Sequence, residues 1–169
     1  MKMASLHDLL VAELKDLYSA ETQLTKALPK MAKEAQSESL REAIESHLTE
    51  TETQIERLDQ IFEMLDIKPG RKKCKAMEGL IEEAEEHASE AEDAVKDAAI
   101  IASAQRVEHY EMAGYGCART FARLLGLDDV AELLQQTLEE EAAADEKLTE
   151  VAMSGANQEA AAADTSDEE

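Results

Sequence analysis

The sequence predicts an all-α fold, a bundle of four long helices, on three observations. The 169 residues include only six glycines and two prolines, so turns are few and long uninterrupted helices have room to form. Apolar residues recur every three or four positions in four segments, which is the spacing of one helix face. No segment alternates apolar and polar residues between turn signals, so we expect no β-sheet.

The first two helices are expected to form an antiparallel hairpin. The first begins near Ser5 as its N-cap, and Pro29 is expected to kink its last turn because proline has no N–H to donate. The second begins at about Ser39, which with Glu42 matches a capping box, and ends before Pro69. The connection between them is short, and short connections join antiparallel neighbours. Their apolar faces hold Leu10, Leu14, Leu17, Leu24, Leu28 and Met31, and then Leu40, Ile44, Leu58, Ile61 and Leu65.

The second pair of long helices and an acidic tail complete the chain. The third long helix runs over about 92–125 and is ended by Gly126. The fourth is capped by Asp129 with Glu132 and runs to about residue 153. We therefore expect one bundle domain over residues 1–153. Residues 154–169 are polar and acidic, and we expect them to form a disordered tail.

The connection between the two hairpins is expected to hold an extra short helix. It follows the basic cluster Arg71 to Lys75 and runs over about 77–87. With short loops inside each hairpin and a much longer connection between them, the chain predicts a four-helix bundle with one long crossover, which is the ferritin-like arrangement. An up-down bundle with the extra helix packed on one end is the competing arrangement.

Acidic residues outnumber basic residues by 39 to 17, and the formal net charge is −22. This charge excludes nucleic acid and anionic membrane surfaces as main partners, since both require a basic protein surface. No segment approaches the roughly 18 apolar residues of a membrane-spanning helix, and the N-terminal segment MKMASLHDLLVAELKD carries acids where a signal peptide is apolar. We expect a soluble, cytoplasmic protein.

The two cysteines, Cys74 and Cys117, are too few for a disulfide framework or a cysteine-rich zinc site. Cys74 lies in the basic cluster, where positive charge would lower the pKa of its thiol and make it reactive. A structural or idle thiol is the interpretation that we favour for Cys74, and the reactive thiol is the alternative. Cys117 is expected to be a small buried hydrophobic residue.

Each long helix carries polar residues where its face should be apolar. A carboxylate in a bundle core is unfavourable unless it is paired, protonated or bound to a metal ion. The residues at such positions are Glu21 in the first helix; His47, Glu50 and Gln54 in the second; Glu108, Glu111 and Tyr115 in the third; and Glu141 and Asp145 in the fourth.

The inward acids are also matched in height along the bundle. Glu21 and Glu50 are nearly equidistant from a turn near residue 36, and Glu111 and Glu141 from a turn near residue 127. At 1.5 Å per residue, both pairs lie roughly 20–24 Å from their turns. This pattern predicts a dinuclear metal site, because dications neutralise carboxylates that would otherwise repel one another. The expected metal ligands are Glu21, Glu50, Glu108, Glu111 and Glu141, with His47, Gln54, Tyr115 and Asp145 as additional ligands or surrounding residues.

Each of these residues also has an ordinary structural explanation. In a chain so rich in acids, a glutamate at one position of a face is often chance, above all Glu141 within the run Glu139–Glu141. His47 would then be a hydrogen-bonded core histidine, and Tyr115 a packing residue. The matched heights on four helices favour the metal site.

Five segments resemble the bacterial YciE/YciF family of ferritin-like stress proteins, and the resemblance covers nearly all of residues 5–153. It implies a rubrerythrin-like helical bundle that forms homodimers, has a di-iron centre and acts under stress in a biochemically undefined role. The segments are DLYSAETQLTKALPKMAKEA (16–35), ESHLTETETQIERLDQIFE (45–63), CKAMEGLIEEA (74–84), AQRVEHYEMAGYG (104–116) and LLQQTLEEEAAADEKLTEVA (133–152).

The resemblance also implies a ligand set, from which this chain departs at two positions. Glu21, Glu50, Glu141 and the run Glu108-x-x-Glu111-x-x-x-Tyr115 match ligand positions of the wider rubrerythrin pattern. Thr53 and Ala144 stand where that pattern has the histidines of two Glu-x-x-His motifs. His47, Gln54 or Asp145 would supply replacement ligands. A site made largely of oxygen ligands accepts manganese as well as iron.

Two functions of different classes follow from these expectations. The first is a stress-response protein with two metal ions, iron or manganese, that reduces peroxide or dioxygen as a di-metal peroxidase or oxidase with an unidentified electron donor. The second is a non-catalytic dimeric scaffold whose metal site is degenerate. The missing histidines support the second function, and the matched acids support the first.

Overall fold

A computed structural model describes residues 3–166, and within them the chain is helical with no strand. The bundle and the extra helix are α1 (Leu6–Glu34), α2 (Glu38–Met64), α3 (Lys75–Glu90), α4 (Asp93–Leu124) and α5 (Asp128–Val151), followed by a π-helical turn (Ala152–Ala156) and α6 (Asn157–Ser166). The all-α prediction is confirmed.

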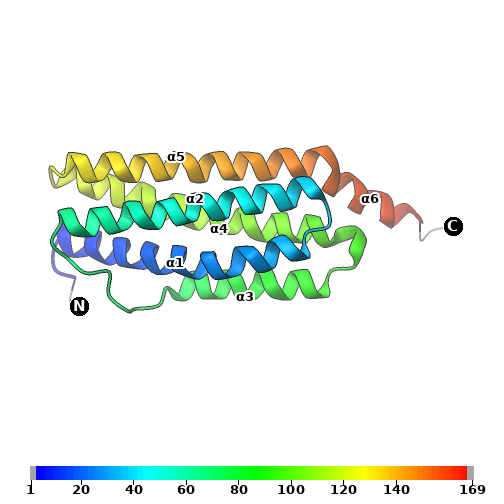
Figure 1. The fold of residues 1–169 in the computed structure, drawn as a ribbon, viewed down its shortest axis with the longest axis horizontal. Coiled ribbons are helices and arrows are strands. Elements are labelled where there is room, and N and C mark those ends of the chain that lie inside the picture. Colours follow the sequence, from blue (N-terminus) through cyan, green and yellow to red (C-terminus); the bar gives the residue numbers. More distant parts are fainter. Residues whose placement is uncertain (1–2, 167–169) are drawn as a thin grey trace.

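The direction of the four long helices identifies the topology (Figure 1). α1 and α2 form an antiparallel hairpin, as do α4 and α5, and α4 runs in the same direction as α2. The long connection that makes this possible carries α3, which packs against both α4 and α1 rather than on one end of the bundle. The ferritin-like arrangement with one long crossover is therefore confirmed over the up-down alternative.

The helix ends follow capping chemistry, with two shifts from the predicted positions. The Oγ of Ser5 accepts from the Asp8 N–H at 3.0 Å, as predicted. The second helix is capped by Ser37 rather than Ser39, because the Ser37 Oγ accepts from the Leu40 N–H at 3.3 Å. In α5, Asp129 lies in the first turn rather than at the cap, where its charge favours the helix N-terminus.

The turn between α4 and α5 depends on a glycine. Gly126 has a φ of +73°, its N–H donates to the Arg123 carbonyl at 3.1 Å, and the Leu127 N–H donates to the Ala122 carbonyl at 2.9 Å. This pair of hydrogen bonds is the Schellman motif, which needs a left-handed residue at this position. The predicted helix end at Gly126 is therefore confirmed.

The segment expected to be a disordered tail is helical in its described part. Residues 154–166 continue from α5 through the π-helical turn into α6, and the side chain of Ala156 is buried. The alanines of residues 160–163 explain the difference, because alanine has the highest helix propensity. The last three residues of the predicted tail lie outside the described residues.

Cys74 is a structural thiol, as favoured from the sequence, whereas Cys117 differs from its expected setting. Cys74 is 1% exposed and caps α3, with its Sγ 3.0 Å from the Asp16 carboxylate and 3.1 Å from the Tyr110 hydroxyl. Burial and the Asp16 carboxylate raise the pKa of the Cys74 thiol, so the expectation of a lowered pKa is wrong. Cys117 is exposed rather than buried.

Polar residues divide the core into two hydrophobic clusters. One cluster lies toward the α1–α2 turn and includes Leu24, Ile44, Val107 and Leu148, one from each long helix. The other lies toward the α4–α5 turn and includes Leu17, Leu58, Tyr115 and Leu134. Between them, the four helices contribute the buried polar side chains of Glu21, His47, Thr51, Gln54, Glu108, Glu111, Thr137 and Glu141.

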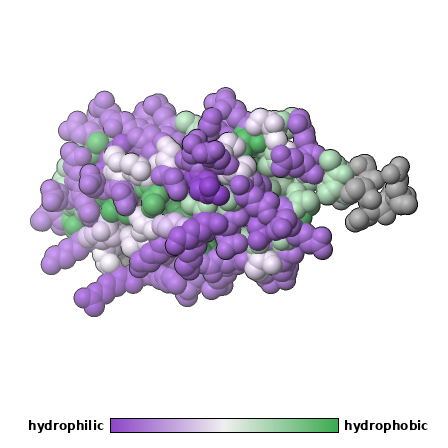
Figure 2. Space-filling model, turned by 45° about the vertical axis from the view of Figure 1, so that its right-hand side comes forward, coloured by the Kyte–Doolittle hydropathy of each residue, from purple (hydrophilic) through white to green (hydrophobic). Residues whose placement is uncertain are grey.

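The surface is largely hydrophilic, in contrast to the apolar core. Figure 2 shows one face on which hydrophilic side chains predominate and hydrophobic areas are small. None of the helices in the described part of the chain is long and apolar enough to span a membrane.

Candidate metal centre

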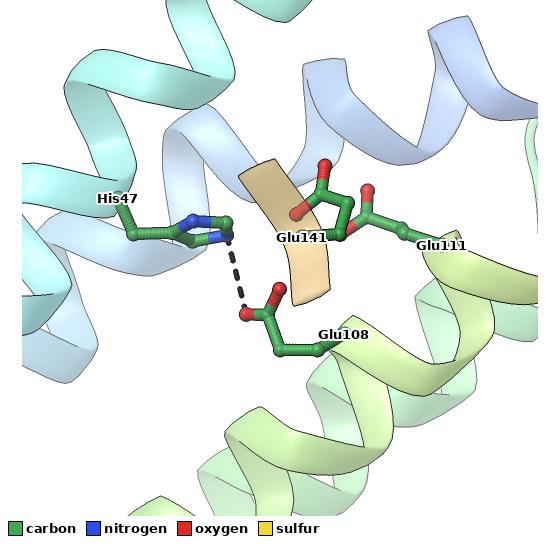
Figure 3. A group of neighbouring side chains, drawn as sticks. All are labelled: His47, Glu108, Glu111 and Glu141. Atoms are coloured by element: carbon green, nitrogen blue, oxygen red, sulfur yellow. Dashed lines mark ion pairs between the residues drawn. The ribbon is translucent and has the colours of Figure 1, made fainter. Parts of the chain in front are cut away.

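One histidine and three glutamates converge in the middle of the bundle (Figure 3). His47 comes from α2, Glu108 and Glu111 from α4, and Glu141 from α5. Each offers a ligand atom, and these atoms all lie within 4.8 Å of one another. The exposed fractions of the four side chains are 7%, 2%, 0% and 0% respectively, so the group is buried. Ligand atoms in this number and proximity are sufficient to hold a metal ion.

Glu21 lies beside this group and is anchored by a tyrosine. Its side chain is fully buried in α1, and the Tyr115 hydroxyl donates to its Oε1 at 2.5 Å. Its Oε2 has no hydrogen-bond partner in the described structure. The charge of Glu141 acts on the Glu21 carboxyl, but Glu21 is not one of the four residues whose ligand atoms lie within 4.8 Å of one another. Four of the five predicted ligands are therefore buried together.

Glu50, the fifth predicted ligand, lies outside the buried group. Its side chain is 43% exposed, and its Oε2 is 3.7 Å from the Nδ1 of His47. The other ring nitrogen of His47, Nε2, is 3.3 Å from the Oε1 of Glu108. His47 therefore stands between a surface carboxylate and a buried one. In α2 the inward positions are 47, 51 and 54, so Glu50 falls at the edge of the helix face.

The other residues named from the sequence lie at or beyond the edge of the centre. Gln54 is buried, and its Nε2 donates to Glu140 at 3.3 Å. Asp145 accepts from the Gln105 side chain at 3.1 Å and does not belong to the converging group. Of the two positions where the rubrerythrin pattern has histidine, Thr53 is exposed and Ala144 is half-buried.

A half-buried ion pair beside the centre was not predicted. The Arg57 guanidinium donates to both oxygens of Glu140 at 2.8 and 2.9 Å, and to the Thr137 hydroxyl at 2.6 Å. A bidentate pair of this kind ties α2 to α5 one residue before Glu141. Its only sequence signal was Glu140 in the acidic run of α5, because Arg57 lies outside the apolar face of α2.

Burial raises the pKa of every carboxyl in the centre. Desolvation and the charge of Glu141 raise the pKa of Glu21 to about 8, against a lowering effect of the Tyr115 hydrogen bond. Desolvation and the charge of Glu21 raise the pKa of Glu108 to about 8. The pKa values of Glu111 and Glu141 lie well above the usual range for the same reasons. Carboxyls crowded in this way hold protons at neutral pH unless another cation replaces those protons.

Neighbouring carboxylates set the direction in which the pKa of His47 is shifted. Burial alone would lower the pKa of its imidazole, but the Glu50 carboxylate and the charges of Glu141 and Glu21 outweigh burial and raise it. The same contact lowers the pKa of Glu50, which keeps that carboxylate ionised at the edge of the site.

The buried polar atoms of the centre lack hydrogen-bond partners within the described structure. They are the Oε2 of Glu21, both ring nitrogens of His47, the Oε2 of Glu108, and both carboxylate oxygens of Glu111 and Glu141. Buried polar groups without partners destabilise a fold, so a set of them at one place indicates a bound group. One nitrogen and several carboxylate oxygens are the ligands that iron and manganese accept. The residues present therefore fit a metal ion.

The sequence is similar to a family of unassigned function and to one named bacterial protein. The family described as "Domain of unknown function (DUF892)" matches residues 5–161. Protein YciF of Escherichia coli (strain K12) is 50% identical over 162 residues, which cover 95% of this chain and 98% of that protein.

Solved structures share the fold. The crystal structure of the Escherichia coli stress protein YciF superposes with a TM-score of 0.87 at 50% identity and covers 92% of this chain and 99% of that one. YcfI from Rhodopseudomonas palustris, described provisionally as a structural protein, superposes with a TM-score of 0.85 at 50% identity and covers 88% and 95%.

Proposed function

Because this chain belongs to the DUF892 family, and with it to the YciE/YciF group of ferritin-like stress proteins, we propose that it is a metal-binding stress protein. One observation carries the proposal. His47 and three buried glutamates converge from α2, α4 and α5, the buried Glu21 lies in α1, and most of their polar atoms have no hydrogen-bond partner in the described structure. Metal ions would neutralise this group and satisfy those atoms.

The proposed centre holds two ions, iron in the first place and manganese as the alternative. His47, Glu108, Glu111 and Glu141 would hold them, with Glu21 as a further ligand. Ions of this kind supply one-electron redox chemistry, which suits the reduction of peroxide or dioxygen with an unidentified electron donor.

The protein's own residues prepare the site in two ways. The Tyr115 hydroxyl holds the Oε1 of Glu21, so the carboxylate is oriented before an ion arrives. The Arg57–Glu140 pair ties α2 to α5 beside Glu141 and keeps the two helices in register. The core carboxyls must lose their protons to coordinate an ion, so binding releases protons.

A non-catalytic dimeric scaffold is the second candidate. It is favoured by the absence of histidine at positions 53 and 144 and by the description of the Rhodopseudomonas palustris relative as a structural protein. Homodimer formation and a cytoplasmic location are parts of both proposals.

Metal analysis of the purified full-length chain separates the two candidates. After growth with iron and manganese, we expect about two ions per chain, and loss of most of that metal in Glu21→Ala and Glu111→Ala. Glu146→Ala, on the exposed face of α5, is the matched control and should keep its metal. Equal trace metal in all four proteins would overturn the metal-binding proposal. Full metal content without consumption of peroxide or dioxygen would favour the scaffold.

A further inference from the structure

An open cavity leads from the surface to one side of the candidate metal centre. It has a volume of about 360 Å³ and lies between α2 and α5, with α1 and α4 beneath. His47 and Glu108 lie at its inner end, while Glu42, Ser46 and Lys147 lie at its mouth. The cavity therefore joins solvent to two of the four converging residues.

The walls of the cavity are apolar and small. Ala43, Ala104, Ala143 and Ala144 line it together with the larger Leu28 and Leu148. Short side chains from three different helices leave the space open, and the aliphatic residues give it a surface suited to a hydrocarbon group.

The volume is larger than peroxide or dioxygen requires. An apolar cavity of about 150 Å³ accommodates benzene, and a water molecule occupies about 30 Å³ in the liquid. The observed volume lies within the range of about 300–1,000 Å³ that is typical of sites for organic ligands. The size and lining thus favour an organic molecule over peroxide or dioxygen.

The charges around the cavity select against an anion. The carboxylates of Glu42 and Glu50 lie at its mouth, and Glu108 lies at its inner end. The one cation among the lining residues, Lys147, is 3.1 Å from the carboxylate of Glu150, which offsets its charge. An anionic ligand would meet the negative charge of Glu42 and Glu50 at the mouth of the cavity.

The inner end offers polar contacts to a ligand. His47 is 7% exposed and Glu108 is 2% exposed. Each offers one atom to the converging group, so the second ring nitrogen of His47 and the second carboxyl oxygen of Glu108 stay available to a ligand. A hydroxyl group can both donate and accept, so it can bond to either residue.

We propose that this cavity binds an uncharged organic molecule of about ten heavy atoms, with its apolar body on the alanines and its hydroxyl-like end at His47 and Glu108. The inference extends the proposed function and rests on it, because the chemistry at the inner end of the cavity is that of the proposed metal centre. It assigns the site a substrate with a hydrocarbon body rather than peroxide or dioxygen alone.

The test uses the full-length metal-free chain and the neutral alcohol 2-phenyl-2-propanol as the probe. Ligand-observed NMR should give saturable 1:1 binding with a Kd on the order of 1 mM or lower. Benzoate, of similar size but anionic, should bind at least tenfold more weakly. Ala144→Leu fills the cavity and should weaken binding of the alcohol at least tenfold, whereas Ala142→Leu, exposed and outside the cavity, should leave it unchanged.

Three results would each overturn the inference. The first is the absence of saturable binding of the alcohol by a chain whose circular dichroism shows it to be folded. The second is equal binding of the alcohol by Ala144→Leu and Ala142→Leu, and the third is equal binding of benzoate and the alcohol. Metal content, measured in parallel on the same variants, tests the proposed function separately. Loss of metal binding is thereby distinguished from loss of alcohol binding.

Discussion

Replacing Glu21 by glutamine should stabilise the metal-free protein at neutral pH. Glutamine has nearly the same shape, and its amide oxygen can still accept from the Tyr115 hydroxyl. The carboxyl of Glu21 has a pKa of about 8 in the folded protein, against an ordinary value of 4.5 for an unfolded chain. The folded state therefore holds the proton more tightly than the unfolded state, and the free energy of unfolding falls as the pH rises from about 4.5 to about 8.

The size of the effect follows from the two pKa values. At pH 7 the carboxyl is ionised in the unfolded chain but still protonated in the fold, and the roughly 2.5 pH units above 4.5 correspond to about 3 kcal/mol at 1.36 kcal/mol each. The Glu21→Gln variant has no carboxyl at this position, so it does not lose this part of the free energy of unfolding. For a chain of this length, about 3 kcal/mol raises the melting temperature by roughly 6–12 °C.

The assay is thermal and urea unfolding of the metal-free wild type and variant, with chelator present, at pH 5 and pH 7. We expect nearly equal stability at pH 5 and a more stable variant at pH 7. Glu146→Gln, on the exposed face of α5, controls for the loss of one negative charge. A wild-type stability that stays level from pH 5 to pH 7, or an equal gain from Glu146→Gln, would refute the reasoning.

Three further predictions concern the frame of the site and its ions. Gly116→Ala should stabilise the protein by about 0.5–1 kcal/mol, because the added Cβ has free space around it. Gly114→Ala should not give this gain, because its Cβ would lie 2.8 Å from the Leu17 Cδ2. Urea unfolding of the two variants measures the difference in stability. Asp97→Ala should cost about 2 kcal/mol in the same assay, since this carboxylate accepts from the Gln36 and Ser37 N–H groups at 2.8 Å each before α2. A loss below about 0.5 kcal/mol, the size of an ordinary surface change, would count against it. Added Mn²⁺ should raise the melting temperature more at pH 8 than at pH 5.5, because protons compete with the ion for the core carboxyls; an equal rise at both pH values would speak against coordination by these residues.

The helices and their inward faces were predictable because they depend on local spacing. The stripe Leu40, Ile44, His47, Gln54 and Leu58 in α2 is buried as the pattern required. The heights of Glu21, Glu111 and Glu141 were predictable for the same reason, since a constant rise per residue converts sequence distance to depth in an antiparallel hairpin.

The roles of Glu50 and His47 could not be separated by spacing alone. Both lie near the inner face of α2, three residues apart, and only the packing of α2 against α4 and α5 decides which side chain is buried. The matched heights favoured Glu50, whereas the structure places His47 in the converging group.

Other differences arose where long-range packing competes with local signals. Cys74 follows a run of basic residues, yet its thiol lies against Asp16 and Tyr110, which are far from it in the sequence. The half-buried pair of Arg57 and Glu140 also joins residues distant in the sequence, and neither belongs to an apolar stripe. Contacts of this kind depend on the assembled bundle.

The most direct test of the metal centre is a crystal structure of the full-length chain grown with Mn²⁺, with anomalous scattering recorded for manganese. The account predicts anomalous peaks in the bundle core, bounded by His47, Glu108, Glu111 and Glu141, with Glu21 adjacent. Peaks confined to surface acids, with the core carboxyls in place and no anomalous density among them, would contradict it.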